Sequence, residues 1–313
     1  MGKKTSWSAT IKPPRLRPGD TVAVPAPAGP VLPEAARRGL EILGTRYNVV
    51  LDEAIYERTG FLAGSDERRA EELNRYLRDS DVRAIIPARG GYGVLRILEL
   101  LDADALKRDP KPIVGFSDLT AFQAWCAKAA GVRTIHGPMV NQIGRVPEID
   151  VEWLFGVLED PGPPGVYADQ LPRVGGRGGG TVEGRMVGGN LEMVTRLLGT
   201  PWAFDLGASA LVLEDVGERP YRIDRALTQL KLAGALDGVR AVALGDFLRS
   251  DEEDGTPPTA AEVLAERLTA FDIPAVAGLP LGHGDRNRAF PLGGRCAVDL
   301  AVGRLVLEEG AVE

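Results

Sequence analysis

The chain has 313 residues, of which 44 % are hydrophobic and 26 % charged, and its formal net charge is -7. This length is typical of two domains, and the composition is that of a folded protein rather than a disordered or fibrous one. The acidic balance argues against a nucleic-acid partner, because binding phosphates requires clustered Lys and Arg. No apolar run approaches the roughly 20 residues that span a bilayer, so we expect no membrane partner.

The few cysteines and histidines limit the chemistry. Cys126 and Cys296 both lie in apolar stretches, which favours buried reduced thiols and a cytoplasmic protein. Two isolated histidines, with no HExxH or CxxC motif, make a poor ligand set, so we expect no metal. The chain also lacks a G-K-[ST] phosphate loop and the G-x-G-x-x-G spacing of a dinucleotide site. We therefore expect no cofactor.

The first half alternates strand-like and helix-like segments. The strand-like segments are 21–27, 82–88 and 111–116, and the helix-like segments are 32–46, 92–106 and 118–131. This alternation predicts a parallel sheet with crossover helices, so we expect an α/β, flavodoxin-like domain over residues 1–160 that carries a nucleophile.

A stretch dense in Pro and Gly follows and predicts a linker over residues 161–180. Beyond it, residues 181–313 predict a second α/β domain. Its expected helices are 190–199, 221–236 and 259–270, and its expected strands are 209–216 and 239–247.

Ser117 lies where an apolar strand passes through Gly115 into a helical pattern. This arrangement resembles a nucleophile elbow, in which a sharp strand-to-helix turn exposes the serine oxygen beside free backbone N–H groups. The usual elbow has Gly two residues after the serine, where this chain has Leu119. A helix cap is the alternative role for Ser117.

A serine nucleophile needs a base, and only His136 and His283 are available. His136 follows a short strand, where a structural role fits equally well. His283 lies between Gly282 and Gly284 in a loop, which leaves room for an imidazole to act, although an exposed loop histidine would look the same.

A third member should be a carboxylate that fixes the histidine tautomer. Glu214 and Asp215 end an apolar strand, where buried acids need partners; capping or a salt bridge is the alternative. Separately, the loop Arg89-Gly90-Gly91-Tyr92-Gly93 follows an apolar run, so its backbone can approach a ligand and donate N–H groups.

Seven blocks along the chain resemble the LD-carboxypeptidase family of serine peptidases, which includes murein tetrapeptide carboxypeptidases and microcin C immunity hydrolases. These blocks are LRPGDTVAVPAPAGPV, RGGYGVLRILELLD, PKPIVGFSDLTAF, TIHGPM, GRMVGGNLEMVTRLLGT, LVLEDVGERPYRIDRALTQL and LPLGHGDRNRAFPLG. The resemblance runs nearly end to end and covers both halves.

This resemblance implies a Ser117–Glu214–His283 triad, an active site between two domains, and a homodimer. It also implies an oxyanion hole formed by the backbone N–H groups of Gly91 and Asp118. The family's elbow has Asp-Leu or Asp-Ile after the serine, which accounts for Leu119. Arg89 is a candidate to pair with a substrate carboxylate, and Tyr92 is a second candidate substrate-binding residue.

The implied reaction is hydrolysis of an L–D amide bond in a small peptide partner, releasing terminal D-alanine from murein tetrapeptide during cell-wall recycling. An alternative within the same chemistry is an immunity-type hydrolase that cleaves the amide of a peptidyl or aminoacyl nucleotide antibiotic. A non-catalytic binding protein is an alternative from another class.

Overall fold

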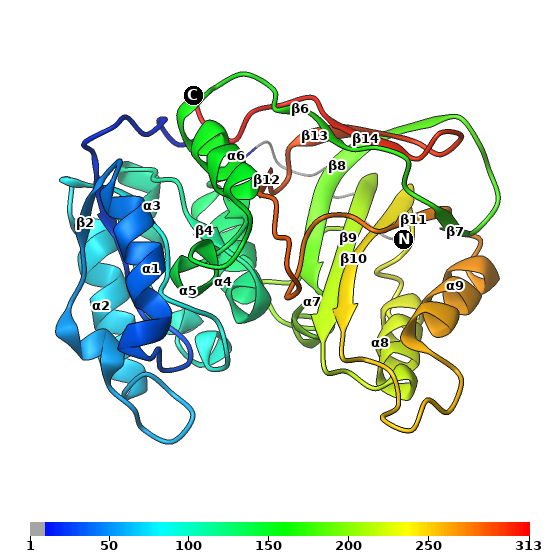
Figure 1. Ribbon diagram of the computed structural model, residues 1–313, viewed down its shortest axis with the longest axis horizontal. Helices are drawn as coiled ribbons and strands as arrows, with labels where there is room; N and C mark the ends of the chain where they lie inside the picture. Colours follow the sequence, from blue (N-terminus) through cyan, green and yellow to red (C-terminus); the bar gives the residue numbers. More distant parts are fainter. Residues whose placement is uncertain (1–9) are drawn as a thin grey trace. The chain divides into compact units, whose positions relative to one another are not determined.

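A computed structural model describes residues 10–313, which form two compact units (Figure 1). The N-terminal unit comprises residues 10–161, 288–291 and 311–313. The C-terminal unit includes residues 162–287 and 292–310. Both contain helices and strands, and the predicted α/β class is confirmed.

The N-terminal unit is built on parallel strands. The elements of this unit are β1 (Thr21–Ala23), α1 (Pro33–Gly44), β2 (Asn48–Val50), η1 (Glu53–Tyr56), α2 (Asp66–Arg78), β3 (Val82–Ile85), η2 (Val94–Arg96), η3 (Leu98–Leu100), α3 (Ala103–Arg108), β4 (Val114–Gly115), η4 (Ser117–Leu119), α4 (Thr120–Trp125), η5 (Cys126–Ala130), β5 (Ile135–His136), α5 (Val140–Ile143), α6 (Glu148–Glu159) and β12 (Phe290–Pro291). Of these, η1 to η4 are 3-10 turns and η5 is a π-helical turn.

The strand order of this unit brings three loops to one edge. Strands pair in the orders β2-β1-β3 and β12-β5-β4, and a parallel bridge between Ile85 and Ile113 links the two sets. All pairs are parallel except β12 with β5. The loops that follow β1, β3 and β4 therefore leave the sheet at its carboxyl-end edge, where α/β proteins commonly bind ligands.

The C-terminal unit contains a mixed sheet of eight strands. The elements of this unit are β6 (Gly165–Ala168), β7 (Arg173–Gly175), β8 (Thr181–Asn190), α7 (Leu191–Arg196), β9 (Ser209–Val216), α8 (Pro220–Leu232), β10 (Ala241–Leu248), α9 (Ala260–Ala270), β11 (Ala275–Ala277), β13 (Arg295–Asp299) and β14 (Arg304–Leu307). The strand order is β6-β14-β13-β8-β9-β10-β11-β7, and the pairs from β8 to β11 are parallel.

Two sequence-based expectations differ from the structure in detail. The Pro- and Gly-rich residues 161–180 include β6 and β7, which pair at the two ends of the eight-stranded sheet. The helix expected over 92–106 is wrong, because this segment forms η2, η3 and the short α3. Asn74 separates the turns from α3: its side chain donates to Leu100 O (2.8 Å) and accepts from Asp102 N–H (2.8 Å).

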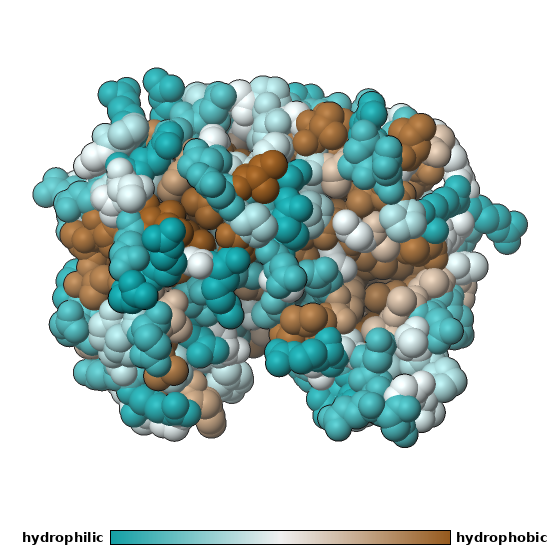
Figure 2. All heavy atoms as spheres, in the orientation of Figure 1, coloured by the Kyte–Doolittle hydropathy of each residue, from teal (hydrophilic) through white to brown (hydrophobic). Residues whose placement is uncertain are grey.

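Each unit has its own apolar core. One cluster joins β1, α1 and α6 in the N-terminal unit, and another joins β8 to β11 with α7, α8 and α9 in the C-terminal unit. Hydrophilic side chains cover most of the face seen in Figure 2, and hydrophobic ones form smaller groups among them. Within residues 10–313, no helix combines the length and apolar character needed to cross a bilayer.

Candidate active site

Ser117 lies directly after β4, at the start of η4. Its φ is +61°, in the left-handed region that a residue with a side chain adopts at a cost of about 1–3 kcal/mol. Of residues 111–126, Ser117 alone is not buried. The cap positions of η4 and α4 are occupied by Phe116 and Leu119. The geometry is therefore that of a strained, accessible serine rather than a helix cap.

The turn explains why Gly115 and Leu119 flank the serine. A Cβ atom on Gly115 would lie 2.8 Å from Leu119 Cβ, closer than such atoms pack. Leu119 itself is fully buried. Gly115 thus makes room for the side chain of Leu119, and this turn carries its glycine before Ser117 rather than two residues after it.

The glycine-rich loop after β3 reaches the serine. A Cβ on Gly90 would lie 3.1 Å from Ser117 Oγ, so only glycine lets the backbone approach this closely without pressing on the hydroxyl. The Gly90 carbonyl accepts a hydrogen bond from Gly29 N–H (3.1 Å), and Gly91 has a φ of +120°. The structure therefore brings together the loop and the serine that the sequence singled out.

Two backbone N–H groups near this turn make no hydrogen bond within the described residues. Within the part of the chain that the structure describes, neither Gly91 N–H nor Asp118 N–H donates a hydrogen bond. Asp118 is 5 % exposed, and an unsatisfied N–H in a buried residue is uncommon. Both groups are thus available to an incoming oxygen atom.

The Asp118 side chain links the serine turn to the glycine-rich loop. Its Oδ2 accepts a hydrogen bond from Val94 N–H at 2.9 Å. The pKa of Asp118 is raised, because the effect of burial outweighs the lowering by this hydrogen bond and by the charge of Arg69. The carboxylate therefore fixes the distance between the two segments that carry the available N–H groups.

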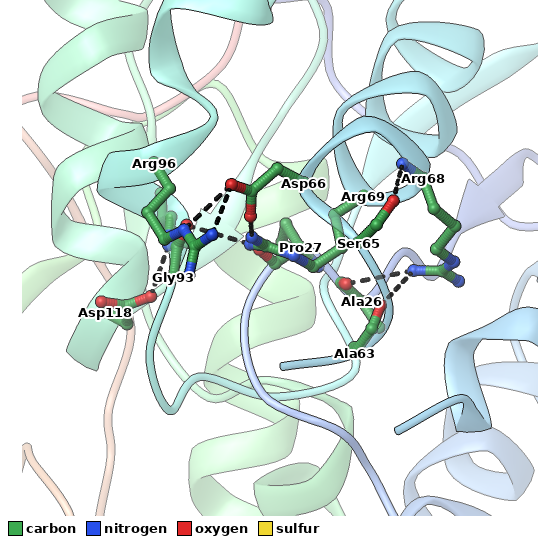
Figure 3. A network of polar contacts seen from close by, with 11 residues as sticks. Ala26, Pro27, Ala63, Ser65, Asp66, Arg68, Arg69, Gly93, Arg96 and Asp118 are labelled. Atoms are coloured by element: carbon green, nitrogen blue, oxygen red, sulfur yellow. Dashed lines mark hydrogen bonds and ion pairs between the residues drawn. The ribbon is translucent and has the colours of Figure 1, made fainter. Parts of the chain in front are cut away.

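Arg69 on α2 also contacts this loop (Figure 3). Its Nη1 donates to Pro27 O (2.5 Å) and Gly93 O (2.9 Å), and its Nη2 pairs with Asp66. Asp66 also binds Arg96, with Oδ2 accepting from Nε at 2.9 Å. The Arg69 side chain is fully buried, so these contacts hold the loops after β1 and β3 together.

In the C-terminal unit, Glu214 and His283 form a hydrogen-bonded pair. His283 Nδ1 lies 2.7 Å from Glu214 Oε2, and the Glu214 side chain is fully buried. A carboxylate oxygen accepts, so Nδ1 carries the hydrogen and Nε2 presents its lone pair. Burial alone would lower the pKa of His283, but the hydrogen bond and charge of Glu214 outweigh burial and raise it.

Asn190, at the end of β8, contacts the two acids near the end of β9. Its Nδ2 lies 3.4 Å from Glu214 Oε1 and 3.0 Å from Asp215 Oδ1. Asp215 Oδ2 also accepts from Glu192 N–H at the start of α7 (2.9 Å). Burial, with the nearby charge of Glu214, raises the pKa of Asp215 to about 7. The two acids differ in their partners. Glu214 contacts His283, whereas Asp215 accepts hydrogen bonds from the backbone N–H groups of Glu192 and Val216.

The glycines around His283 are explained by Asp246 on β10. A Cβ on Gly284 would lie 2.4 Å from Asp246 Oδ2, and Gly284 N–H donates to that oxygen at 3.2 Å. A Cβ on Gly282 would lie 3.2 Å from Glu214 Oε2. The loop therefore lies against two carboxylates, and its glycines set the position of the imidazole.

His136, the other candidate base, is fully buried on β5. Its ring stacks on Phe290 of β12, with centroids 4.7 Å apart and an angle of 15° between the planes. The ring centroid of Phe116 lies 5.9 Å from that of His136. These contacts give His136 a packing role in the N-terminal sheet.

Sequence patterns pointed to the serine turn and the glycine-rich loop, and the family resemblance pointed to Glu214 and His283, but neither pointed to the residues that support them. Asn190 and Asp246 carried no recognisable signal and Arg69 carried only one, because each acts through a contact between distant segments. The one available signal for Arg69 was its place three residues after Asp66 on a helix, a spacing that favours an ion pair.

The arrangement suits acyl transfer. A strained serine beside available N–H groups can attack a carbonyl and stabilise the resulting oxyanion, and a histidine oriented through Nδ1 can accept a proton at Nε2. Among residues 10–313, no group of three or more His, Cys, Asp or Glu side chains is placed to hold a metal ion.

Comparison with curated proteins finds relatives of similar length. The probable murein peptide carboxypeptidase of Bacillus subtilis is 33 % identical over 320 aligned positions, which cover 99 % of this chain and 98 % of the relative. The whole chain, not one half, therefore aligns with this relative.

Comparison with solved structures also finds matches over nearly the whole chain. A muramoyltetrapeptide carboxypeptidase from Oxalobacter formigenes matches with a TM-score of 0.79 and 30 % identity, covering 93 % of this chain and 98 % of that one. The microcin C7 self-immunity protein in complex with aspartyl sulfamoyl adenosine matches with a TM-score of 0.88 and 25 % identity, covering 97 % and 100 %.

Two family models match in chain order. Residues 22–137 match the LD-carboxypeptidase N-terminal domain, and residues 183–298 match the LD-carboxypeptidase C-terminal domain. The family resemblance noted in the sequence is confirmed, and the chain belongs to the LD-carboxypeptidase family.

Proposed function

We propose that the protein is a serine carboxypeptidase that hydrolyses an L–D amide bond and releases terminal D-alanine from murein tetrapeptide. The observation that carries this proposal is the turn at Ser117, where a strained, accessible serine lies beside a loop and turn with two available N–H groups. Relatives that carry the names murein peptide and muramoyltetrapeptide carboxypeptidase support the substrate class.

In this proposal Ser117, Glu214 and His283 are the catalytic triad. Ser117 attacks the amide carbonyl, and His283 accepts its proton at Nε2 while Glu214 holds Nδ1–H. The N–H groups of Gly91 and Asp118 stabilise the oxyanion, and each such donor is worth about 3 kcal/mol. His283 then protonates the leaving amine, and water hydrolyses the acyl-enzyme by the same route.

Arg89 and Tyr92 are the proposed substrate-binding residues. Both line one pocket of the N-terminal unit, together with Gly91. The proposal also includes a homodimer that acts in the cytoplasm during cell-wall recycling. Two buried, unpaired cysteines suit a reducing compartment.

The test is incubation with purified murein tetrapeptide, with released D-alanine measured for the wild type, Ser117→Ala and Ser80→Ala. Ser80 is exposed and lies in the same unit, so its variant controls for loss of a hydroxyl. We expect release by the wild type and the Ser80 variant and none by the Ser117 variant. No release by the wild type, or equal release by all three, contradicts the proposal.

A second candidate is an immunity-type hydrolase that cleaves the amide of an aminoacyl or peptidyl nucleotide. The observation in its favour is the TM-score of 0.88 with the microcin C7 self-immunity protein bound to aspartyl sulfamoyl adenosine. Incubation with a peptidyl nucleotide of that class, scored for amide cleavage, distinguishes the two. Cleavage of the nucleotide without cleavage of tetrapeptide assigns the immunity function, and binding of either without cleavage assigns a non-catalytic binding protein.

A further inference from the structure

A pocket of about 360 Å³ opens in the N-terminal unit between the loops that follow β1 and β3. We call it the arginine pocket, and its lining includes Gly29, Tyr56, Arg58, Phe61, Arg89 and Tyr92. Strand β1 lies between β2 and β3, so the chain reverses its direction of winding at this point of the sheet. Crevices at such points are preferred ligand sites in α/β folds.

The charge of the pocket favours an anion. Arg58 and Arg89 both line it, and no carboxylate does. Among the described residues neither guanidinium pairs with an acid, whereas Arg75 on α2 pairs with Asp52 at 3.0 Å. Two cations without acidic partners in one pocket contrast with the net charge of -7 of the chain. A planar guanidinium matches the geometry of a carboxylate.

Arg89 is held in place before any ligand arrives. Its Nη1 donates to Pro30 O at 3.1 Å, and its Nη2 lies 3.7 Å from the position that a Cβ on Gly91 would occupy. Its Nε is buried and, among the residues described, has no hydrogen-bond partner. An arginine fixed in this way loses little conformational entropy on binding, which favours affinity.

The rim of the pocket is apolar. The rings of Phe61 and Tyr92 meet edge to face with centroids 5.2 Å apart, and both are more than half exposed, at 62 % and 52 %. Leu32 adds a third exposed apolar side chain at 57 %. This surface suits the methyl group and backbone of a small residue that carries the anion.

We propose that the arginine pocket binds the free terminal carboxylate of the substrate and so makes the enzyme a carboxypeptidase rather than an endopeptidase. This inference rests on the proposed function. Gly91 lines the pocket and is also the proposed donor to the scissile carbonyl. The terminal carboxylate belongs to the next residue along the peptide, and consecutive Cα atoms are about 3.8 Å apart. Gly91 therefore borders both the pocket and the proposed position of the scissile carbonyl.

The test compares murein tetrapeptide with the same peptide carrying a terminal carboxamide, scoring the tripeptide product common to both. The proteins are the wild type, Arg58→Gln, Arg89→Lys and the control Arg37→Gln. Arg37 is an exposed arginine of α1 that pairs with Glu41 and does not line the pocket. The carboxamide removes the negative charge of the terminal carboxylate and leaves the scissile bond unchanged.

We expect the wild type and the Arg37 variant to prefer the acid about ten- to hundredfold in kcat/KM, with the difference mainly in KM. Arg58→Gln should reduce this preference several-fold. Arg89→Lys should reduce it further, because lysine keeps the charge but lacks the forked donors. For the acid, the loss in both pocket variants should appear mainly as a higher KM.

Two outcomes overturn the inference while leaving the proposed function standing: equal cleavage of acid and amide by the wild type, or an unchanged preference in both pocket variants. If the wild type cleaves neither peptide, the proposed function fails. In that case the binding of the two peptides, measured by calorimetry, tests the inference separately from catalysis. Tighter binding of the acid supports the inference, and equal binding of the acid and the amide refutes it.

Discussion

His283 Nδ1 lies 2.7 Å from Glu214 Oε2, and this contact fixes which nitrogen of the imidazole carries the hydrogen. Because Glu214 is fully buried and cannot exchange this partner for water, the tautomer is set by the fold. Replacement of the acid by its amide keeps the shape of the side chain and changes only its charge and donors.

Glu214→Gln should therefore lower kcat on the order of 10⁴-fold with little change in KM. An amide can present its NH₂ group to Nδ1, which stabilises the wrong tautomer. The pKa of His283 is raised by Glu214, so in the variant it should fall and the acid limb of the kcat/KM profile should move to lower pH. Steady-state kinetics across the neutral pH range measure both effects, and an acid limb that stays in place would assign that limb to another group.

Asp118→Ala should weaken catalysis without removing any reacting group. The loss of the carboxylate frees Val94 N–H in a buried position, at a cost of about 1–3 kcal/mol, and loosens the loop that carries Gly91. A displacement of about 1 Å can cost on the order of 100-fold in kcat. Asp118→Asn retains an acceptor for Val94 N–H and should stay much closer to wild type. Equal losses in the two variants would point to the charge of Asp118 rather than to its hydrogen bond.

Gly284→Ala should displace the His283 loop, because the new Cβ would lie 2.4 Å from Asp246 Oδ2. We expect a loss of about 1–3 kcal/mol in the free energy of unfolding and a reduced kcat. Gly179→Ala is the matched control, since a Cβ there meets nothing within 4 Å. Denaturant unfolding and D-alanine release measure the two effects. The double variant Gly284→Ala/Asp246→Ala should recover part of the loss, and its failure to do so would place the strain elsewhere.

Asp215 should make stability depend on pH. Its folded pKa of about 7 lies above its ordinary value, so its contribution is fully present below about pH 4 and is lost as pH rises through 7. The loss amounts to at most about 4 kcal/mol. Asp215→Asn lacks this titration, so its free energy of unfolding relative to wild type should rise as the pH is raised from acidic to mildly alkaline values. Urea unfolding at several pH values tests this, and a constant difference would contradict it.

The sequence was most informative where backbone geometry demands a particular residue. The glycine-rich loop predicted a close backbone approach because glycine has no Cβ, and Gly90 lies against Ser117. The apolar run before Glu214 predicted the strand β9 over its full length, since a buried parallel strand needs continuous apolar residues. The family resemblance, not local pattern, selected His283 over His136.

The rest depends on contacts between residues far apart in the chain. Arg69 joins segments around Pro27 and Gly93, and no local pattern indicates which carbonyls a buried arginine will meet. The helix expected over 92–106 was wrong for the same reason, because Asn74 binds Leu100 and Asp102 and divides the segment. Pro and Gly between 161 and 180 hid β6 and β7, which are short strands at the ends of the sheet, where such residues are tolerated.

The discontinuity of the N-terminal unit limits how the chain can be cut for study. Strand β12 pairs with β5, with Phe290 opposite His136, although β5 lies near the middle of the chain and β12 near its end. Glu313 likewise exchanges backbone hydrogen bonds with Pro13 and Arg15. A fragment ending near residue 161 would lack both contacts and expose the edge of β5. Work on an isolated half therefore has to supply residues 288–291 and 311–313 as well, by a circular permutation or by a complementing peptide.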